Sequence, residues 1–425
     1  MALDLDPILD LSLSARIKGL PAAAEGLAMR EVGAQGWNLF DGSIPLPAAV
    51  IRSSVLTKNL HTFQTYIDQA GAKLAPHGKT SMCPQLFDRQ LEAGAWGMTV
   101  ATFSQANTAL DYGVKTLLIA NELAGVAEIR ALAARQDAAS DILILSLVDS
   151  LAGVERLESI LIDADAKRPF EVLVELGISG GRTGARTRAR ALDIARRVAQ
   201  SPVLSLRGVE GYEGLIVTGD AAADAVRVGA FLDDLLGLFN TCRDEGLFAG
   251  EPILSAGGSA YFDLVARGLK TDGVTPLLRS GCYLTHDTGF YNKLLAHVGE
   301  RGVLGPAPAL NPALEVWAQV VSQPEPDLII VNAGRRDLSD DAGLPKVEYH
   351  ATPGANASAQ AVENWSFFRM NDQHGYIRLP AGASVNIGDY VGLGISHPCT
   401  TFDRWPVLLE VDDAYAVTGA LKTFF

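Results

Sequence analysis

Cysteine is scarce in this chain of 425 residues, and its four copies (Cys83, Cys242, Cys282 and Cys399) lie far apart. There is no CxxC spacing and no density of cysteines typical of a small disulfide-stabilised scaffold. No apolar run reaches the length of a membrane span, and Asp4 and Asp6 stand where a secretory signal would carry positive charge. The sequence therefore predicts a protein of the reducing cytoplasm that has no membrane partner.

Basic residues are in the minority, since 35 Lys and Arg face 49 Asp and Glu for a net charge of −14. Without a dense Lys/Arg run the chain lacks the counterion release that drives nucleic-acid binding, which excludes nucleic acid as an expected partner. Hydrophobic residues make up 48% and charged residues 20%, which is ordinary for a globular protein. The length exceeds what one hydrophobic core usually holds, so we expect two structural units.

From about Ala48 the chain alternates short aliphatic runs with longer amphipathic stretches. About eight such units over roughly 250 residues predict a (β/α)₈ barrel in residues 48–304. An open doubly wound sheet is the alternative, but no GxGxxG follows the first strand. The predicted strands are 49–53, 73–76, 98–102, 116–120, 142–148, 170–176, 204–210 and 252–256. The clearest predicted helices are 54–70, 187–199 and 222–242.

After Gly305 the sequence pattern changes to runs of alternating apolar and polar residues, with no convincing helices between them. Residues 305–425 therefore read as a mainly antiparallel β unit. Its predicted strands are 314–321, 328–332, 375–379, 390–393 and 407–411. Residues 1–47 form an extension with one amphipathic helix at Pro7–Leu20, which could pack on either unit.

A lysine follows one of the predicted barrel strands, where barrel enzymes place their active sites. The segment Ala75–Thr80 sets Lys79 among Pro, His and Gly at the mouth of the barrel. A desolvated lysine at such a place can attack a carbonyl as an amine nucleophile. The plainer interpretation is a loop lysine that faces solvent.

Two glycine-rich turns also follow predicted strands. Glu175–Gly184 lets backbone N–H groups approach an anion or a ring and supplies Arg182 as a cation, although an ordinary loop would look the same. Ser255–Ser259 offers two glycines and two hydroxyls, which suit a phosphomonoester, and Arg279–Tyr283 could close the same pocket. No GxxxxGK[ST] motif is present, so a nucleoside triphosphate is not implied.

His397 and Cys399 stand two positions apart in the β unit. On an extended segment both side chains point to the same side, which suits two ligands of one Zn²⁺ with open positions left for chemistry. A buried cysteine beside a structural histidine is the plainer alternative.

Taken in this order, the segments resemble the fold-type III pyridoxal-phosphate enzymes, whose barrel is of the alanine racemase type. More narrowly they resemble the D-serine dehydratase and D-threonine aldolase branch. The resemblance spans roughly Pro47 to Asp412, and five ordered motifs are more specific than any one alone. The matching segments are Pro76–Thr80, Gly180–Gly184, Gly211–Gly214, Gly257–Ser259 and His397–Cys399.

The resemblance implies roles for individual residues. Lys79 would form the Schiff base with pyridoxal 5'-phosphate and later take the α-proton. His77 would support the cofactor, and Arg182 would face its pyridine nitrogen. His397 and Cys399 would hold Zn²⁺, with Mn²⁺ as the alternative ion. The remaining residues of the implied cofactor cradle are Tyr212, Thr218, Gly257, Gly258, Cys282 and Tyr283.

The implied substrate is a D-amino acid that bears a β-hydroxyl group, such as D-serine. A cysteine as second metal ligand resembles the dehydratases and predicts loss of water, which yields a 2-keto acid and ammonia. The alternative is an aldolase of the D-threonine type, which yields glycine and an aldehyde. A non-catalytic homologue that only binds pyridoxal phosphate is a second alternative. The resemblance also implies a homodimer.

Overall fold

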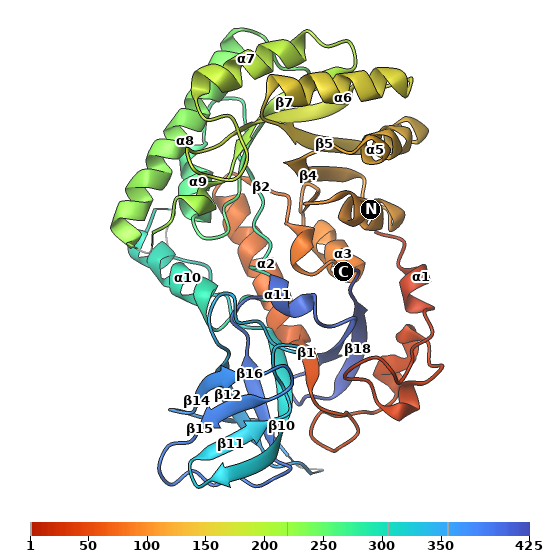
Figure 1. Cartoon of the computed structure of the whole chain (residues 1–425), viewed down its shortest axis with the longest axis vertical. Helices are drawn as coiled ribbons and strands as arrows, with labels where there is room; N and C mark the ends of the chain where they lie inside the picture. Colours follow the sequence, from red (N-terminus) through yellow and green to blue (C-terminus); the bar gives the residue numbers. More distant parts are fainter. Residues whose placement is uncertain (1, 219, 304–305, 355–356) are drawn as a thin grey trace.

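The computed structural model describes residues 2–218, 220–303, 306–354 and 357–425. It contains eight parallel strands that curl into one sheet in the order β2-β9-β8-β7-β6-β5-β4-β3 (Figure 1). The two ends of this order meet through a parallel bridge between His77 and Thr99, so the sheet closes. The predicted (β/α)₈ barrel is confirmed. Its strands are β2 (Lys73–Leu74), β3 (Met98–Val100), β4 (Thr116–Glu122), β5 (Leu143–Val148), β6 (Phe170–Leu176), β7 (Leu204–Gly211), β8 (Ile253–Ala256) and β9 (Leu277–Leu278).

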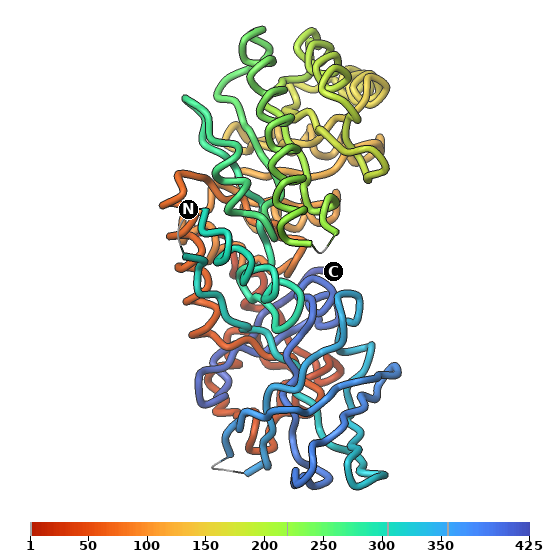
Figure 2. Tube along the Cα trace, turned by 90° about the vertical axis from the view of Figure 1, so that its left-hand side faces the viewer, coloured from red at the N-terminus to blue at the C-terminus, as the bar shows by residue number. Residues whose placement is uncertain are grey.

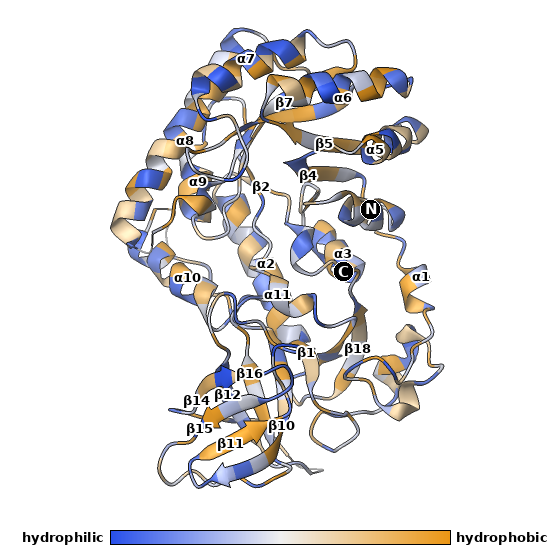
Figure 3. Cartoon of the chain, in the orientation of Figure 1, coloured by the Kyte–Doolittle hydropathy of each residue, from blue (hydrophilic) through white to orange (hydrophobic). Residues whose placement is uncertain are grey.

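The barrel helices form where the 3.6-residue period of apolar side chains predicts them. Ile194 and Val198 of α7 are buried against the sheet, and Thr187 caps the helix by accepting a hydrogen bond from the backbone N–H of Arg190. Hydrophilic and hydrophobic residues alternate along α7 in Figure 3. The helices are α2 (Ser53–Gln69), α3 (Pro84–Glu92), α4 (Phe103–Asp111), α5 (Val126–Ala138), α6 (Leu151–Asp163), α7 (Arg188–Ala199), α8 (Ala221–Asp244), α9 (Phe262–Gly268) and α10 (Phe290–Arg301).

A second, mainly antiparallel sheet forms the β unit, in the order β13-β12-β16-β10-β1-β17-β18. Strand β11 pairs with β10 and β15, and β14 pairs with β15, which extends the sheet to one side. Its strands are β1 (Ala48–Arg52), β10 (Leu314–Glu325), β11 (Leu328–Val331), β12 (Lys346–Ala351), β13 (Gln360–Ala361), β14 (Ser366–Met370), β15 (Gly375–Arg378), β16 (Tyr390–Gly394), β17 (Val407–Val411) and β18 (Val417–Lys422).

The predicted strand at 49–53 was expected to be the first strand of the barrel, and this expectation is wrong. Strand β1 pairs antiparallel with β10 and parallel with β17, so it belongs to the β unit. Residues Ala48–Ile51 are buried on both faces of the strand, and either sheet could accommodate such a strand. The local sequence therefore does not indicate with which strands β1 pairs. The eighth barrel strand is instead the two-residue β9. The division of the chain at 47/48 and 304/305 stays a prediction, and the second boundary lies outside the described residues.

The predicted helix at Pro7–Leu20 is also wrong, because only α1 (Asp6–Leu9) is helical there. The chain then folds back on itself, and Leu13 N–H donates to the carbonyl of Leu27. Ile8, Leu13 and Leu20 are buried separately, in one cluster with residues of the β unit such as Trp317. The apolar spacing therefore reflects individual anchors and not a helical face. Two 3₁₀ turns follow, η1 (Ala22–Ala24) and η2 (Met29–Ala34).

The extension packs mainly on the β unit, as the red and blue segments in Figures 1 and 2 illustrate. Asp4 N–H donates a hydrogen bond to the carbonyl of Tyr112, and Leu3 N–H donates one to the carboxylate of Asp88, which also fixes the first residues of the extension to the barrel. Among the described helices none is both long and apolar enough to cross a bilayer.

Candidate active site

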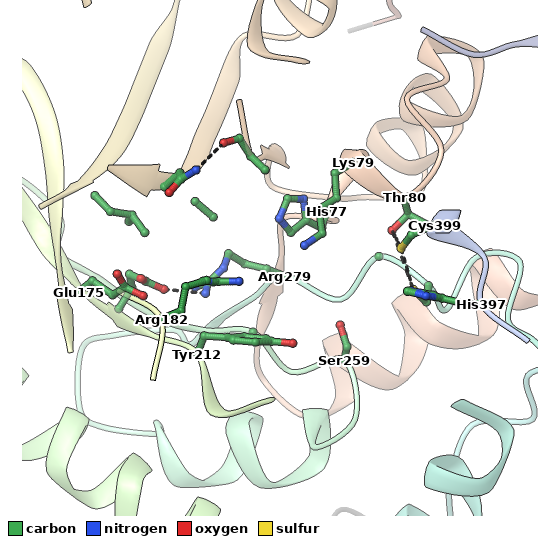
Figure 4. A pocket seen from close by; sticks show the side chains of 18 of the residues that line it. His77, Lys79, Thr80, Glu175, Arg182, Tyr212, Ser259, Arg279, His397 and Cys399 are labelled. Atoms are coloured by element: carbon green, nitrogen blue, oxygen red, sulfur yellow. Dashed lines mark hydrogen bonds and ion pairs between the residues drawn. The ribbon is translucent and has the colours of Figure 1, made fainter. Parts of the chain in front are cut away.

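A cavity of about 390 Å³ opens at the carboxyl ends of the barrel strands, where the segment before β17 closes it from the side of the β unit. This volume lies within the range of small-molecule sites. Figure 4 shows that side chains from both units point into it. The residues that line it include His77, Lys79, Thr80, Asn121, Glu175, Arg182, Glu210, Tyr212, Gly257, Ser259, Arg279, Cys282, Tyr291, His397 and Cys399.

Lys79 enters the cavity from η3 (Gly78–Thr80), a single 3₁₀ turn that follows β2. Its side chain lies beside the ring of His77 in Figure 4. Burial, together with the cationic Lys79 and Arg279, holds the pKa of His77 well below its ordinary value, so this imidazole is neutral at pH 7. Nδ1 of His77 is buried and has no hydrogen-bond partner among the described residues, which leaves a polar atom available to a ligand.

Arg182 lies in the glycine-rich loop after β6, with its guanidinium 5.2 Å from the centroid of the Tyr212 ring. The loop is held by Arg186, whose guanidinium donates hydrogen bonds to the carbonyls of Gly181, Arg182 and Gly184, each at 3.0 Å. Arg182 is thus a positioned cation at the cavity wall, as the sequence predicts.

The loop Gly257–Ser259 is organised differently from the prediction. The two glycines were expected to suit a phosphomonoester, but the N–H groups of Gly257 and Gly258 donate to the carboxylate of Glu213, at 3.1 and 2.7 Å. Gly257 packs tightly on Tyr212, because a Cβ at this position would lie 2.6 Å from the tyrosine ring. Gly257 and Ser259 line the cavity, whereas Gly258 does not.

Thr218 and Tyr283 are not brought to the cavity wall. The backbone N–H and the hydroxyl of Thr218 both donate to Asp224 Oδ1, at 2.8 and 2.7 Å, so this residue is tied to the first turn of α8. The Tyr283 ring stacks on Phe63 with centroids 4.2 Å apart, and its hydroxyl accepts a hydrogen bond from Gln90. Tyr283 is therefore a core residue, and its neighbour Cys282 faces the cavity instead.

His397 and Cys399 come together by a route that the sequence did not indicate. The predicted extended segment is wrong, because Pro398 has helical dihedrals (φ −59°, ψ −46°) and starts a one-turn helix, α11 (Cys399–Phe402). Proline suits this position, since its fixed φ matches a helix start. Nδ1 of His397 lies 2.7 Å from Asp341 Oδ2, which fixes the orientation of the ring.

A third candidate donor lies beside this pair. Cys282 Sγ is 3.6 Å from Cys399 Sγ, and the donor atoms of Cys282, His397 and Cys399 all lie within 4.8 Å of one another. A hydrogen bond with Cys282 lowers the pKa of the Cys399 thiol well below its ordinary value, against the effect of burial and with the help of His397. Burial lowers the pKa of His397, but its contacts with Cys399 and Asp341 raise it to about 9. Sulfur and imidazole donors of this kind fit a zinc ion.

The sequence interpretation named the segments that begin at Glu175 and Arg279 but missed the acidic residues that lie beside them. Glu210 and Arg279 form a buried ion pair at 2.6 Å in the cavity floor. Carboxylate oxygens of Glu122, Asp149 and Glu175 lie within 4.8 Å of one another. Acidic residues stand at the ends of the apolar strands β4, β6 and β7, and this pattern could have indicated site residues. A carboxylate is rarely buried at the end of an apolar strand for packing alone. Asp341, in a loop between β11 and β12, carries no such signal.

The chain is similar to known proteins over most of its length. Residues 313–411 match a family described as a putative serine dehydratase domain. A D-threonine aldolase from Arthrobacter sp. is 28% identical over 87% of this chain and 90% of its own length. A D-threo-3-hydroxyaspartate dehydratase from Delftia sp. (strain HT23) is 26% identical over 90% of this chain and 97% of its own length.

The fold agrees with these sequence matches. The crystal structure of a D-threonine aldolase from Filomicrobium marinum superimposes with a TM-score of 0.75 at 24% identity, over 91% of this chain and 97% of that one. Barrel, β unit and their order along the chain are thus shared. Together with the lysine after β2 and the cavity shared by both units, these matches confirm the resemblance of the chain to the fold-type III pyridoxal-phosphate enzymes, and more narrowly to the D-serine dehydratases and D-threonine aldolases.

Proposed function

We propose that the protein is a lyase dependent on pyridoxal phosphate and zinc, which dehydrates a D-β-hydroxy amino acid to a 2-keto acid and ammonia. One observation carries the proposal: the amine of Lys79 and the donor atoms of His397 and Cys399 share a single cavity. The relatives named above, an aldolase and a dehydratase, both act by name on β-hydroxy D-amino acids. The choice of dehydration rests on Cys399, as the sequence resemblance implies.

The residues of the cavity suit the cofactor. Lys79 would bind its aldehyde carbon, Arg182 would lie at the ring nitrogen, and the hydroxyls of Tyr212 and Ser259 are available to the phosphate. When bound, the cofactor withdraws electrons from the substrate α-carbon. Lys79, the amine on the cavity wall, would accept the α-proton at Nζ. Glu213 would keep the Gly257–Ser259 loop in place, because its carboxylate already holds the two glycine amides.

His397 and Cys399 would hold the metal at the end of the cavity that faces the β unit. A divalent ion there acts as a Lewis acid on a substrate oxygen, worth several kcal/mol toward the departure of a hydroxyl group. The thiolate donor favours Zn²⁺ over Mn²⁺, since soft ligands select zinc. Asp341 would keep His397 in the orientation needed for metal binding.

The test is a product analysis with the purified protein loaded with pyridoxal phosphate and Zn²⁺. D-serine, D-threonine and D-threo-3-hydroxyaspartate would be supplied in turn, and keto acid plus ammonia would be measured against glycine plus aldehyde. Keto acid and ammonia in equal amounts support the proposal. Glycine and an aldehyde as the only products would replace it with the aldolase.

The aldolase is the second candidate function, and the similarity to the Arthrobacter D-threonine aldolase supports it. Both reactions need the amine and the metal, but the aldolase breaks the Cα–Cβ bond after a base takes the β-hydroxyl proton. A cofactor-binding protein without catalysis is a third alternative, and absence of both product pairs with bound cofactor would support it. The homodimer and the cytoplasmic location stay predictions.

A further inference from the structure

Cys282 occupies an unexpected position for a residue of the cofactor cradle. It follows β9 in the barrel, yet its sulfur lies against Cys399 of the β unit, 3.6 Å away. We propose that Cys282 is a third protein ligand of the metal ion, so that the site is a Cys₂His site. This inference rests on the proposed metal site at His397 and Cys399.

The spacing of the two sulfurs fits a shared metal ion. Two thiolates on a tetrahedral zinc, each at about 2.3 Å from the ion, lie about 3.8 Å apart. The observed 3.6 Å between Cys282 Sγ and Cys399 Sγ is close to this value. A disulfide would require about 2.05 Å. All three donor atoms, including a ring nitrogen of His397, fall within 4.8 Å of one another, which allows a single ion to contact each of them.

The surroundings hold Cys282 in this position. The loop after β9 packs closely against the loop after β2. A Cβ at Gly281 would lie only 2.6 Å from the carbonyl oxygen of His77, so a larger residue at this position would not fit without a shift. Thr80 Oγ1 lies 3.9 Å from Cys282 Sγ and 3.4 Å from Cys399 Sγ, so one hydroxyl lies beside both sulfurs. Figure 4 shows Thr80 next to Cys399. Cys282 is 5% exposed, and its sulfur faces the cavity that holds Lys79.

A third protein ligand changes what the site can do. Three protein donors around a tetrahedral ion leave one open position, which a substrate oxygen or a water can take. Two thiolates neutralise the charge of Zn²⁺ and make the site softer, which selects Zn²⁺ or Co²⁺ against Mn²⁺. We therefore expect the metal to be retained through dialysis.

Metal binding without turnover tests this inference. Zinc content and affinity, by competition with a chelator, would be measured for the wild type, Cys282→Ser, Cys399→Ser and Cys242→Ser. Cys242 is the control, because it is buried in α8 and does not line the cavity. Cys282→Ser should weaken zinc binding about 100-fold or more, on the scale of a lost coordination bond. Cys242→Ser should bind zinc as the wild type does.

Cobalt gives a count of the thiolate ligands. In the Co²⁺-loaded protein, the sulfur-to-metal charge-transfer absorption of Cys282→Ser should be roughly half that of the wild type. The absorption of Cys399→Ser should also be roughly half, since each single variant loses one of two thiolates. X-ray absorption of the zinc-loaded wild type should show a shell of two sulfur neighbours at about 2.3 Å from the zinc. This last measurement needs no variant and so does not depend on how Cys282→Ser folds.

Three outcomes would overturn the inference. Unchanged zinc affinity and cobalt absorption in Cys282→Ser, with a single sulfur neighbour of zinc in the wild type, would exclude Cys282 as a ligand and leave the metal site of the proposed function intact. A wild type that binds neither zinc nor cobalt would overturn both. A mass two hydrogens lower in freshly purified, unreduced protein, mapped to Cys282 and Cys399, would replace the metal ligand with a disulfide.

Discussion

Arg89 of α3 and Glu410 of β17 form a two-pronged ion pair between the barrel and the β unit. Nη1 and Nη2 of the arginine lie 2.6 and 2.8 Å from the two carboxylate oxygens. Helix α3 follows the turn that carries Lys79, and β17 follows the helix that carries Cys399. The pair therefore fixes the two halves of the candidate site relative to each other.

Arg89→Met should destabilise the protein by about 1–2 kcal/mol, because a charge-assisted pair is lost and Glu410 is left mostly buried, with partial solvent access reducing the effect. Urea unfolding of the metal-free protein measures this change. Arg196→Met is the matched control, since its ion pair with Glu245 lies on the surface and contributes little. Equal unfolding midpoints for the two variants would contradict the role given to Arg89.

Lys79→Ala should abolish both turnover and the visible absorbance of the bound cofactor, because no other amine lines the described part of the cavity. An absorbance spectrum after gel filtration with pyridoxal phosphate checks this, alongside the product assay. Lys115→Ala, which alters a half-exposed lysine paired with Asp141, should behave as the wild type. Full turnover in the Lys79 variant would show that another group carries the chemistry.

Gly257→Ala should weaken cofactor binding at least tenfold, since the added methyl would lie 2.6 Å from the Tyr212 ring and force that ring or the loop to shift. The dissociation constant for pyridoxal phosphate, followed by absorbance titration, is the measurement. Gly229→Ala is the control, because its Cβ would meet nothing within 4 Å in α8. Alanine there should preserve binding and stabilise the helix by up to about 1 kcal/mol.

Glu122→Gln should change how stability depends on pH. Burial, followed by the neighbouring Glu175, raises the pKa of Glu122 to about 9 from an ordinary value of 4.5. The folded protein therefore holds a proton that the unfolded chain has released, so this group costs stability as the pH rises from about 4.5 to 9. Glutamine stays neutral and removes that cost. The melting temperature of the cofactor-free variant should rise relative to that of the wild type as the pH increases from 5 to 9. A difference in melting temperature that stays constant over this range would refute the assignment.

The barrel could be predicted because its signals are local. Strand β6 at Phe170–Leu176 has the predicted bounds, and helix α7 begins one residue from its predicted start. Buried aliphatic strands and amphipathic helices depend on side chains that are close in sequence. Strand β1 could not be assigned to its sheet, because pairing with β10 and β17 depends on residues far along the chain.

The site was predictable in part for the same reason. Lys79, Arg182, Tyr212, Gly257, Cys282, His397 and Cys399 line one cavity, and each follows a strand or stands in a short motif. The contact between Cys282 and Cys399 depends on how the two units pack, which no spacing in the sequence reports. Thr218 and Tyr283 stand near the motifs, yet the Thr218 hydroxyl donates to Asp224 and the Tyr283 ring stacks on Phe63. Neighbourhood in sequence does not fix the direction of a side chain.

The parallel pairing of β1 with β17 has a consequence for biosynthesis. Val50 leaves the ribosome early, but its partner Leu409 is added more than three hundred residues later. At a translation rate of about 5–20 residues per second, roughly 20–70 seconds pass between the synthesis of Val50 and that of Leu409. Until β17 is made, one edge of the apolar strand β1 has no partner, although β9, the last barrel strand, is already made at Leu278. An unpaired apolar strand of this kind suits chaperones that shield strand edges.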